Sequence, residues 1–143
     1  GMGSLAGGEL GKERMDNAYE TKEQEEEHSC FSDTTLDNLY NDAVGIKNAY
    51  LGTSSNGKAA DGDVGLDALV KAKDAALDEK VKADLEAVLS AIKAIPAPFD
   101  QAILGNDDSE GRTKIKEAID ACSTLAGSIA DVADLLGIKI NFE

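Results

Sequence analysis

Basic residues, histidine, cysteine and long apolar runs are all scarce in this sequence. Its 14 lysines and arginines stand against 28 aspartates and glutamates, which gives a formal net charge of -14. Such a charge repels phosphate backbones and anionic lipids, so nucleic acid and membrane surfaces are poor partners. No apolar run approaches the roughly 20 residues that span a bilayer, and no basic stretch precedes an apolar one. We therefore expect neither a membrane-spanning segment nor a targeting signal.

The scarcity of histidine and cysteine limits where site chemistry can occur. The sequence has one histidine, His28, and two cysteines, Cys30 and Cys122. The cysteines lie in different predicted elements, and we expect two unpaired, buried thiols rather than a disulfide. Metal or acid/base chemistry is therefore expected in residues 25–33, which read Glu-Glu-Glu-His-Ser-Cys-Phe-Ser-Asp.

Helical periodicity is abundant. At 143 residues the chain has the size of one domain. Apolar residues recur at three- and four-residue steps, which predicts helices over 5–19, 33–52, 66–95 and 109–137. Alternation typical of a strand is confined to the short tail, 138–142. The sequence therefore predicts one domain, 1–143, that is all-α and forms an antiparallel up-and-down four-helix bundle.

Particular residues refine these elements. Glycines in the first helix each cost roughly 1 kcal/mol relative to alanine, unless a neighbouring backbone packs closely against them. Residues 20–27 read as a solvated helical end, and Ser32 or Asp33 as the N-cap of the second helix. Asp74 is a candidate break in the third helix, and the glycines at 52 and 137 end their helices. Residues 53–63 are turn-forming, whereas Phe99 and Ile103 are expected to fold back on the core.

Spacing alone leaves several kinds of chemistry open around His28. Glu25 and His28 have the Glu-x-x-His spacing of di-iron bundles, but no second histidine completes such a site. A mononuclear site of His28 with Glu9, Glu27 or Asp33 suits iron or zinc. The alternative is a solvent-facing glutamate run followed by a histidine that caps a turn.

Nucleophilic chemistry and calcium binding are weaker interpretations. The carboxylates near Cys30 disfavour a thiolate. Ser29, Ser32 and Asp33 lack an oxyanion-hole glycine motif for Ser-His-Asp catalysis. The acidic loop 106–111 lacks the spacing of a calcium loop and indicates a helix N-terminus.

Four stretches carry a family resemblance. They are residues 1–15, with Gly-Met-Gly-Ser-Leu-Ala-Gly-Gly-Glu-Leu and Glu-Arg-Met; 27–33, Glu-His-Ser-Cys-Phe-Ser-Asp; 45–52, with Gly-Ile and Tyr-Leu-Gly; and 98–103, Pro-Phe-Asp-Gln-Ala-Ile. Together they resemble the imelysin family, also called insulin-cleaving metallopeptidase-like or iron-regulated protein A-like. The resemblance implies two similar four-helix bundles with a metal or ligand site between them. This chain is similar to the C-terminal bundle.

The resemblance also implies site residues. Glu9, Arg14, His28, Ser29, Ser32 and Asp33 would line the second wall of the site, with His28 as a ligand or proton carrier. Of the carboxylates that suit a metal site with His28, Glu27 is the one that we expect to be a ligand. In the alternative interpretation Arg14 and Glu9 form a structural pair, and Ser32 or Asp33 only caps a helix.

The chain departs from the family's pattern at two points. The family's Gly-x-His-x-x-Glu metal motif has no match, because Phe31 stands three residues after His28. Members also often have an asparagine and a second histidine where this sequence has Thr34 and Leu36. Both departures argue against metal binding or peptidase activity by this chain alone.

Three functional hypotheses follow. The first is a module of a periplasmic or cell-surface protein that binds a metal, iron or zinc, or a small ligand, linked to iron uptake. The second is part of a metallopeptidase of the imelysin type. The third is a non-catalytic bundle that docks an N-terminal half; the expected partner is that second bundle or another copy of the chain.

Overall fold

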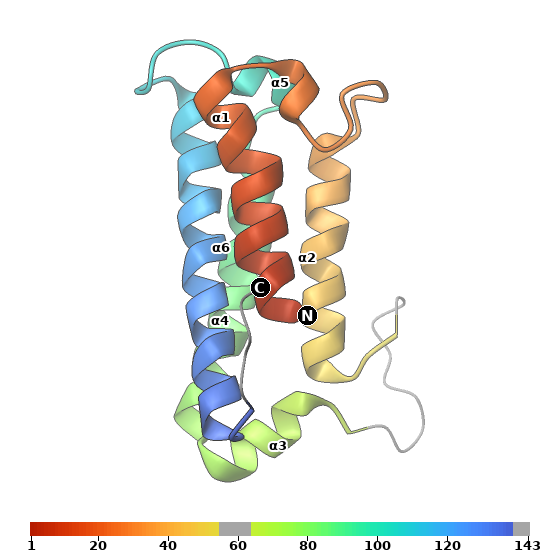
Figure 1. Cartoon of the computed structure of the whole chain (residues 1–143), viewed down its shortest axis with the longest axis vertical. Helices are drawn as coiled ribbons and strands as arrows, with labels where there is room; N and C mark the ends of the chain where they lie inside the picture. The colour runs from red at the N-terminus through yellow and green to blue at the C-terminus, as the bar shows by residue number, and fades with distance from the viewer. Residues whose placement is uncertain (55–63, 139–143) are drawn as a thin grey trace.

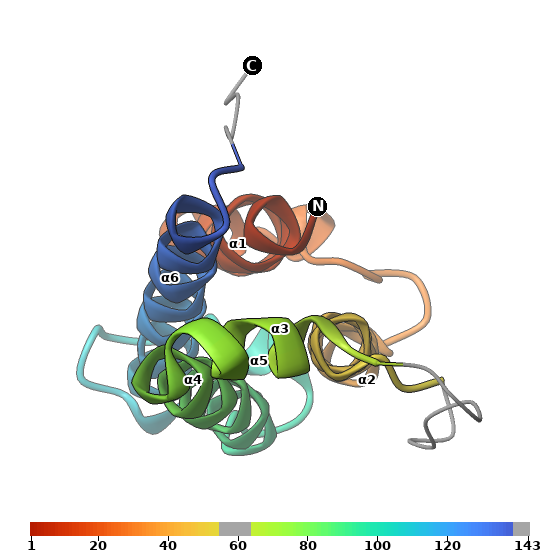
Figure 2. The ribbon, with the colours of Figure 1, turned by 90° about the horizontal axis from the view of Figure 1, so that it is seen from below.

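The computed structural model describes residues 1–54 and 64–138, and within them the chain is all-α. The elements are η1 (Ser4–Asp16), α1 (Asn17–Thr21), η2 (Gln24–Glu26), α2 (Thr35–Leu51), α3 (Leu66–Lys73), α4 (Ala75–Lys93), α5 (Phe99–Ala102) and α6 (Glu110–Leu135). Four long rods, η1 with α1, α2, α4 and α6, run side by side (Figure 1). Seen from below, these rods surround a common centre, and α3 crosses between α4 and α2 (Figure 2).

The predicted fold is confirmed in its class but not in its detail. Six α-helices pack together in the described part of the chain. A simple up-and-down arrangement of four helices is not confirmed, because α3 and α5 interrupt the connections between the rods.

The core forms where the apolar stripes of the rods meet. Its largest fully buried side chains come from every rod and from α3; they include Leu10, Met15, Leu39, Ile46, Tyr50, Val70, Leu85, Ile92, Ile115 and Leu125. Full burial of one such aliphatic side chain contributes about 1.5–3 kcal/mol. Phe99 and Ile103 are also buried, which confirms that the segment after the two prolines folds back on the core.

A glycine face on η1 lets this element lie unusually close to α6. A Cβ atom at Gly7 would lie 2.9 Å from the Cβ of Ala126, and one at Gly11 would lie 3.3 Å from the Cβ of Cys122. The expectation that a neighbour packs against the glycines is confirmed for these two positions.

Helix ends follow the sequence at several places. Asp74 breaks the third predicted helix and caps α4 by accepting hydrogen bonds from the backbone N–H groups of Ala76 and Leu77, both at 3.0 Å. Gly52 and Gly137 follow the ends of α2 and α6 with φ of 66° and 70°. Residues 55–63 of the predicted loop and 139–142 of the predicted tail lie outside the described residues.

Two predictions about helix ends are wrong. The N-cap of α2 is Thr34 rather than Ser32 or Asp33, since Asp33 takes a left-handed conformation with φ of 55° before the helix begins. The stretch 20–27 is not a continuous helical end, because Lys22 is also left-handed and terminates α1. Its last residue, Glu27, is only 4% exposed rather than solvated.

A buried carboxylate joins three of the helices. Asp78 on α4 accepts a hydrogen bond from the Tyr50 hydroxyl of α2 at 3.1 Å and one from Lys82 Nζ at 2.9 Å. Lys82 Nζ also lies 3.1 Å from Asp67 Oδ2 on α3. This network holds α3 in place. None of the described helices is long and apolar enough to cross a membrane.

Candidate functional site

The ion pair between Glu9 and Arg14 follows from the geometry of η1. This element is a 13-residue π-helix, and the N–H of Asn17 bonds to the carbonyl of Lys12, five residues back. Side chains five residues apart therefore fall on one face. Arg14 donates from Nε at 2.9 Å and from Nη2 at 2.8 Å to Glu9 Oε1. Because both side chains are more than a third exposed, the pair contributes at most about 1 kcal/mol to stability.

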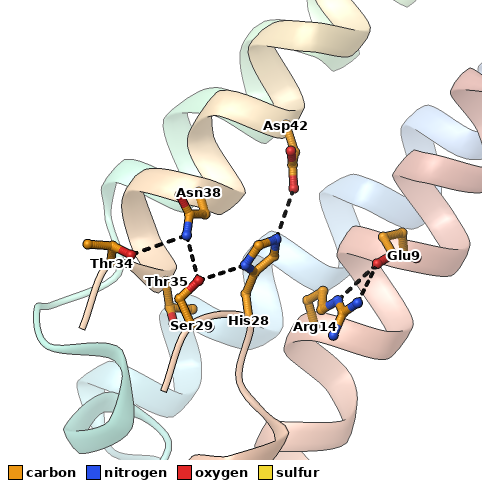
Figure 3. Close-up of polar contacts among 8 residues, drawn as sticks. All are labelled: Glu9, Arg14, His28, Ser29, Thr34, Thr35, Asn38 and Asp42. Atoms are coloured by element: carbon orange, nitrogen blue, oxygen red, sulfur yellow. Dashed lines mark hydrogen bonds and ion pairs between the residues drawn. The ribbon is translucent and has the colours of Figure 1, made fainter. Parts of the chain in front are cut away.

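His28 lies in the loop before α2, and its ring has a polar contact on each side, one to the loop and one to α2. Its Nδ1 lies 2.9 Å from Ser29 Oγ, and its Nε2 lies 3.4 Å from Asp42 Oδ2 (Figure 3). On the other side of Ser29 from the ring, Asn38 Nδ2 donates to Ser29 Oγ at 2.5 Å and to Thr34 Oγ1 at 3.2 Å. The imidazole is thereby fixed between the loop and α2.

A cleft of about 450 Å³ opens between η1 and α2, lined by Ser4, Leu5, Glu9, His28 and Asp42. His28 and Asp42 lie on one side of it and Glu9 on the other (Figure 3). The cleft therefore combines two carboxylates and one imidazole, with Arg14 attached to Glu9. The cleft can both donate and accept hydrogen bonds, and its carboxylates attract a cationic group.

The remaining predicted site residues lie around the cleft rather than in its lining. Ser29 contacts His28 Nδ1 and is not in the cleft lining. Ser32 and Asp33 are exposed in the loop, where Ser32 Oγ is 2.8 Å from Thr34 Oγ1 and also donates to the carbonyl of Ser29 at 3.4 Å. The structure thus brings Glu9, Arg14 and His28 together at the cleft and places Ser32 and Asp33 in the supporting loop.

Glu27 is buried and is not part of the cleft lining. Its Oε1 has no hydrogen-bond partner, although Thr35 bonds to the carboxyl group. Burial raises the pKa of the Glu27 carboxyl, and the charges of Asp100 and Asp33 raise it further, against hydrogen bonds from Thr35 and Gln24 that lower it. Asp100 also has a buried oxygen without a partner, Oδ1.

Both cysteines are free thiols, as expected, but only Cys122 is fully buried. Burial raises the pKa of the Cys122 thiol to about 12, which makes it a poor nucleophile. Cys30 is half-buried in the loop that carries His28.

Sequence reasoning missed Asn38 and Asp42. These residues are four apart on α2, so they lie on the same face of the helix. That spacing is the available signal. It shows that the two side chains are neighbours, but not that the loop folds His28 against them.

The donors at the cleft fit a metal ion only in part. Within residues 1–54 and 64–138, no three side chains of His, Cys, Asp or Glu are grouped closely enough to hold an ion. His28 Nε2 and Asp42 Oδ2, 3.4 Å apart, nevertheless match the separation of about 3.4 Å between two tetrahedral ligands at 2.0–2.1 Å from one ion. The described residues thus hold two suitably spaced donors and no third.

The fold and the cleft define an all-α protein with a polar, carboxylate-rich cleft between two helices. The family model of imelysin, Peptidase_M75, matches residues 1–129. The chain therefore belongs to the imelysin family.

Two solved structures share the fold. One is described as an iron-regulated protein A precursor from Parabacteroides distasonis, with a TM-score of 0.76 and 24% identity over 94% of this chain and 38% of that one. The other is an imelysin peptidase from Bacteroides ovatus, with a TM-score of 0.71 and 23% identity over 91% of this chain and 36% of that one. No curated protein sequence matches the chain. The chain thus spans little more than a third of the solved structures that it resembles.

Proposed function

We propose that this chain forms one wall of a binding site for a metal ion or small ligand in a cell-envelope protein linked to iron uptake. The observation that carries the proposal is the convergence of Glu9, His28 and Asp42 on one cleft from η1, the loop and α2. The iron link and the location in the periplasm or at the cell surface rest on the family and on the description of one relative as an iron-regulated protein A precursor.

A metal held here would be bound by His28 and Asp42, with further ligands from a second bundle or from water. Glu9 is already hydrogen-bonded to Arg14, and Glu27, the other expected metal ligand, is buried away from the cleft lining. Two protein donors are fewer than the three or four that zinc sites use. The candidate ions remain iron and zinc.

Calorimetric titration with Zn²⁺ and Fe²⁺ tests the metal form of this proposal. We expect weak binding by the wild-type chain that His28→Ala and Asp42→Ala both abolish. Asp37→Ala is the matched control, because it removes an equal charge from an exposed position on the same helix. Absence of binding, or binding that survives His28→Ala, contradicts a metal at this cleft.

The small-ligand form needs a different probe. A panel of small charged and hydroxylated molecules is added to labelled protein, and shifts of the His28 ring signals are followed by NMR. We expect shifts that Asp42→Ala abolishes and Asp37→Ala preserves. If no member of the panel moves the His28 signals, the small-ligand form is wrong.

A second candidate function is docking to another helical bundle. The side chain of Phe31, three residues after His28, is fully exposed. We expect Phe31 to be an anchor residue of an interface with a second bundle or a second copy of this chain.

The solution mass, measured by light scattering over a concentration series, tests the self-association form. We expect association that Phe31→Ser abolishes, while Leu104→Ser, a substitution of another exposed apolar residue, leaves it intact. A strictly monomeric wild-type chain contradicts pairing of two copies.

The metallopeptidase alternative is supported by the family name alone.

A further inference from the structure

We propose that Asn38 is a positioning residue for His28: acting through Ser29, it fixes the imidazole with its proton on Nε2, which faces Asp42. The proposal rests on the proposed function only in taking the cleft as a binding site. It assigns a role to two residues of α2, Asn38 and Asp42, that lie outside the segment 25–33.

The side-chain amide of Asn38 donates to two hydroxyl groups. Its amide nitrogen carries two hydrogens, and two hydroxyl oxygens lie within hydrogen-bonding distance, Ser29 Oγ at 2.5 Å and Thr34 Oγ1 at 3.2 Å. Both hydroxyl groups therefore accept from Asn38. Each of them must direct its own hydrogen elsewhere.

Ser29 directs its own hydroxyl hydrogen toward the ring of His28. The Ser29 hydroxyl oxygen lies 2.9 Å from His28 Nδ1. Among the described residues, Nδ1 is the acceptor available to the Ser29 hydroxyl hydrogen. A neutral imidazole has one donor nitrogen and one acceptor nitrogen. Since Nδ1 accepts from Ser29, the proton of the ring is on Nε2, 3.4 Å from Asp42 Oδ2.

The loop around Ser29 is oriented by the other branch of the same network. Thr34 accepts from Asn38, so its hydroxyl hydrogen is free to bond to Ser32 Oγ at 2.8 Å. Ser32 Oγ in turn donates to the carbonyl of Ser29 at 3.4 Å, and the backbone N–H of Ser29 donates to Thr35 Oγ1 at 3.1 Å. These bonds hold Ser29 from its backbone as well as from its side chain. In this arrangement each donor in the series Asn38 Nδ2, Ser29 Oγ and His28 Nε2 faces an acceptor.

This tautomer determines what the cleft can recognise. With its proton on Nε2, His28 presents a hydrogen-bond donor beside the carboxylates of Asp42 and Glu9. A metal ion at Nε2 would have to displace that proton. Within the proposed function, the geometry thus favours a small organic ligand with an acceptor for His28 and a hydroxyl or ammonium donor for the carboxylates.

The test reads the tautomer directly by NMR. Because the sequence contains one histidine, long-range ¹H–¹⁵N correlation of the ¹⁵N-labelled, ligand-free chain gives a single set of ring signals. At a pH where the ring is neutral, we expect the wild-type chain to show the Nε2–H form. In Asn38→Asp the new carboxylate accepts the Ser29 hydrogen, so Ser29 Oγ can accept from Nδ1–H. The tautomer ratio should then move toward Nδ1–H by about tenfold, the change that one hydrogen bond supplies.

Matched variants separate positioning from a general effect. Asn41→Asp places the same charge at an exposed position on the same helix and should leave the ratio unchanged. Ser29→Ala removes the link and should also shift the ratio toward Nδ1–H. An Nδ1–H form in the wild-type chain, or equal ratios in Asn38→Asp and Asn41→Asp, overturns the proposal. If Asn38→Asp does not fold, Asn38→Ala replaces it: this variant frees Ser29 Oγ to accept from Nδ1–H, and an unchanged tautomer ratio would overturn the proposal. Since no ligand is added, failure of the binding proposal leaves this result unaffected.

Discussion

Substituting alanine at two adjacent glycines of η1 should change stability in opposite directions. A Cβ at Gly7 would lie 2.9 Å from the Cβ of Ala126 on α6, closer than two carbon atoms can pack. A Cβ at Gly8 meets nothing within 4 Å. The same chemical change on the same helix therefore tests the close approach of η1 to α6.

The magnitudes follow from two opposing terms. Alanine gains up to about 1 kcal/mol over glycine in a helix, and we expect Gly8→Ala to retain this gain. At Gly7 the same gain is opposed by overpacking of about 1–3 kcal/mol, because the contact is with a Cβ that cannot rotate away. Gly7→Ala should therefore be less stable than Gly8→Ala by about 1–3 kcal/mol.

Urea unfolding followed by circular dichroism measures both variants. The midpoints should move in opposite directions, or at least separate, with unchanged slopes. The double variant Gly7→Ala with Ala126→Gly should recover stability, with a coupling of about 0.5–3 kcal/mol. Equal stabilities of the Gly7 and Gly8 variants, or no recovery in the double variant, would refute the packing argument.

Three further predictions concern buried groups. Because burial raises the pKa of Glu27 above its ordinary value, the folded protein holds this proton at pH values where the unfolded chain has lost it. The wild type should therefore lose stability relative to Glu27→Gln as pH rises from about 4.5 through the raised pKa of Glu27. Urea titrations at several pH values measure this difference. The stability of the wild type relative to Glu26→Gln, a change at an exposed position, should show no such trend. Tyr50→Phe should cost about 1 kcal/mol in thermal unfolding, and Asp78→Ala should cost more, up to about 3 kcal/mol, because it removes the shared acceptor; equal costs would contradict the shared carboxylate. In a thiol-labelling assay Cys30 should react well before Cys122, and two rapidly labelled thiols in the native chain would show that Cys122 is accessible.

Much of the fold could be predicted from local sequence. Apolar residues at helical spacing located the long helices, and Asp74 located a break because its carboxylate caps α4 within the next three residues. The glycines of η1 predicted a closely packed neighbour, and Gly7 and Gly11 have one. These signals succeed because the cause and the effect lie within one element or one contact face.

The N-cap of α2 and the burial of Glu27 could not be predicted in this way. Asp33 is suited to capping, but the turn of the loop forces it into a left-handed conformation and leaves Thr34 at the helix start. Glu27 follows three glutamine or glutamate residues of η2, and only the tertiary position of the loop against its surroundings buries it. Both outcomes are set by how the loop is placed, which depends on residues distant in sequence.

The candidate site shows the same division. His28 was identified because it is the one histidine, and Glu9 and Arg14 through the family resemblance. Their pairing across five residues depends on π-helical hydrogen bonding, which apolar periodicity does not reveal. Asp42 enters the site only because the loop folds back along α2.

The glycine contacts and the cleft are two consequences of the same placement of η1. This element packs against α6 on one side and against α2 on the other. On the α6 side, Gly7 and Gly11 fix how closely η1 can approach. On the α2 side, Glu9 and Asp42 line the same cleft, so any displacement of η1 changes the distance between their carboxylates. A methyl group at Gly7 should therefore weaken binding at the cleft as well as folding, although it touches no residue of the site. Restoration of both by Ala126→Gly would show that the position of η1, rather than local chemistry at Gly7, controls the spacing of the cleft walls.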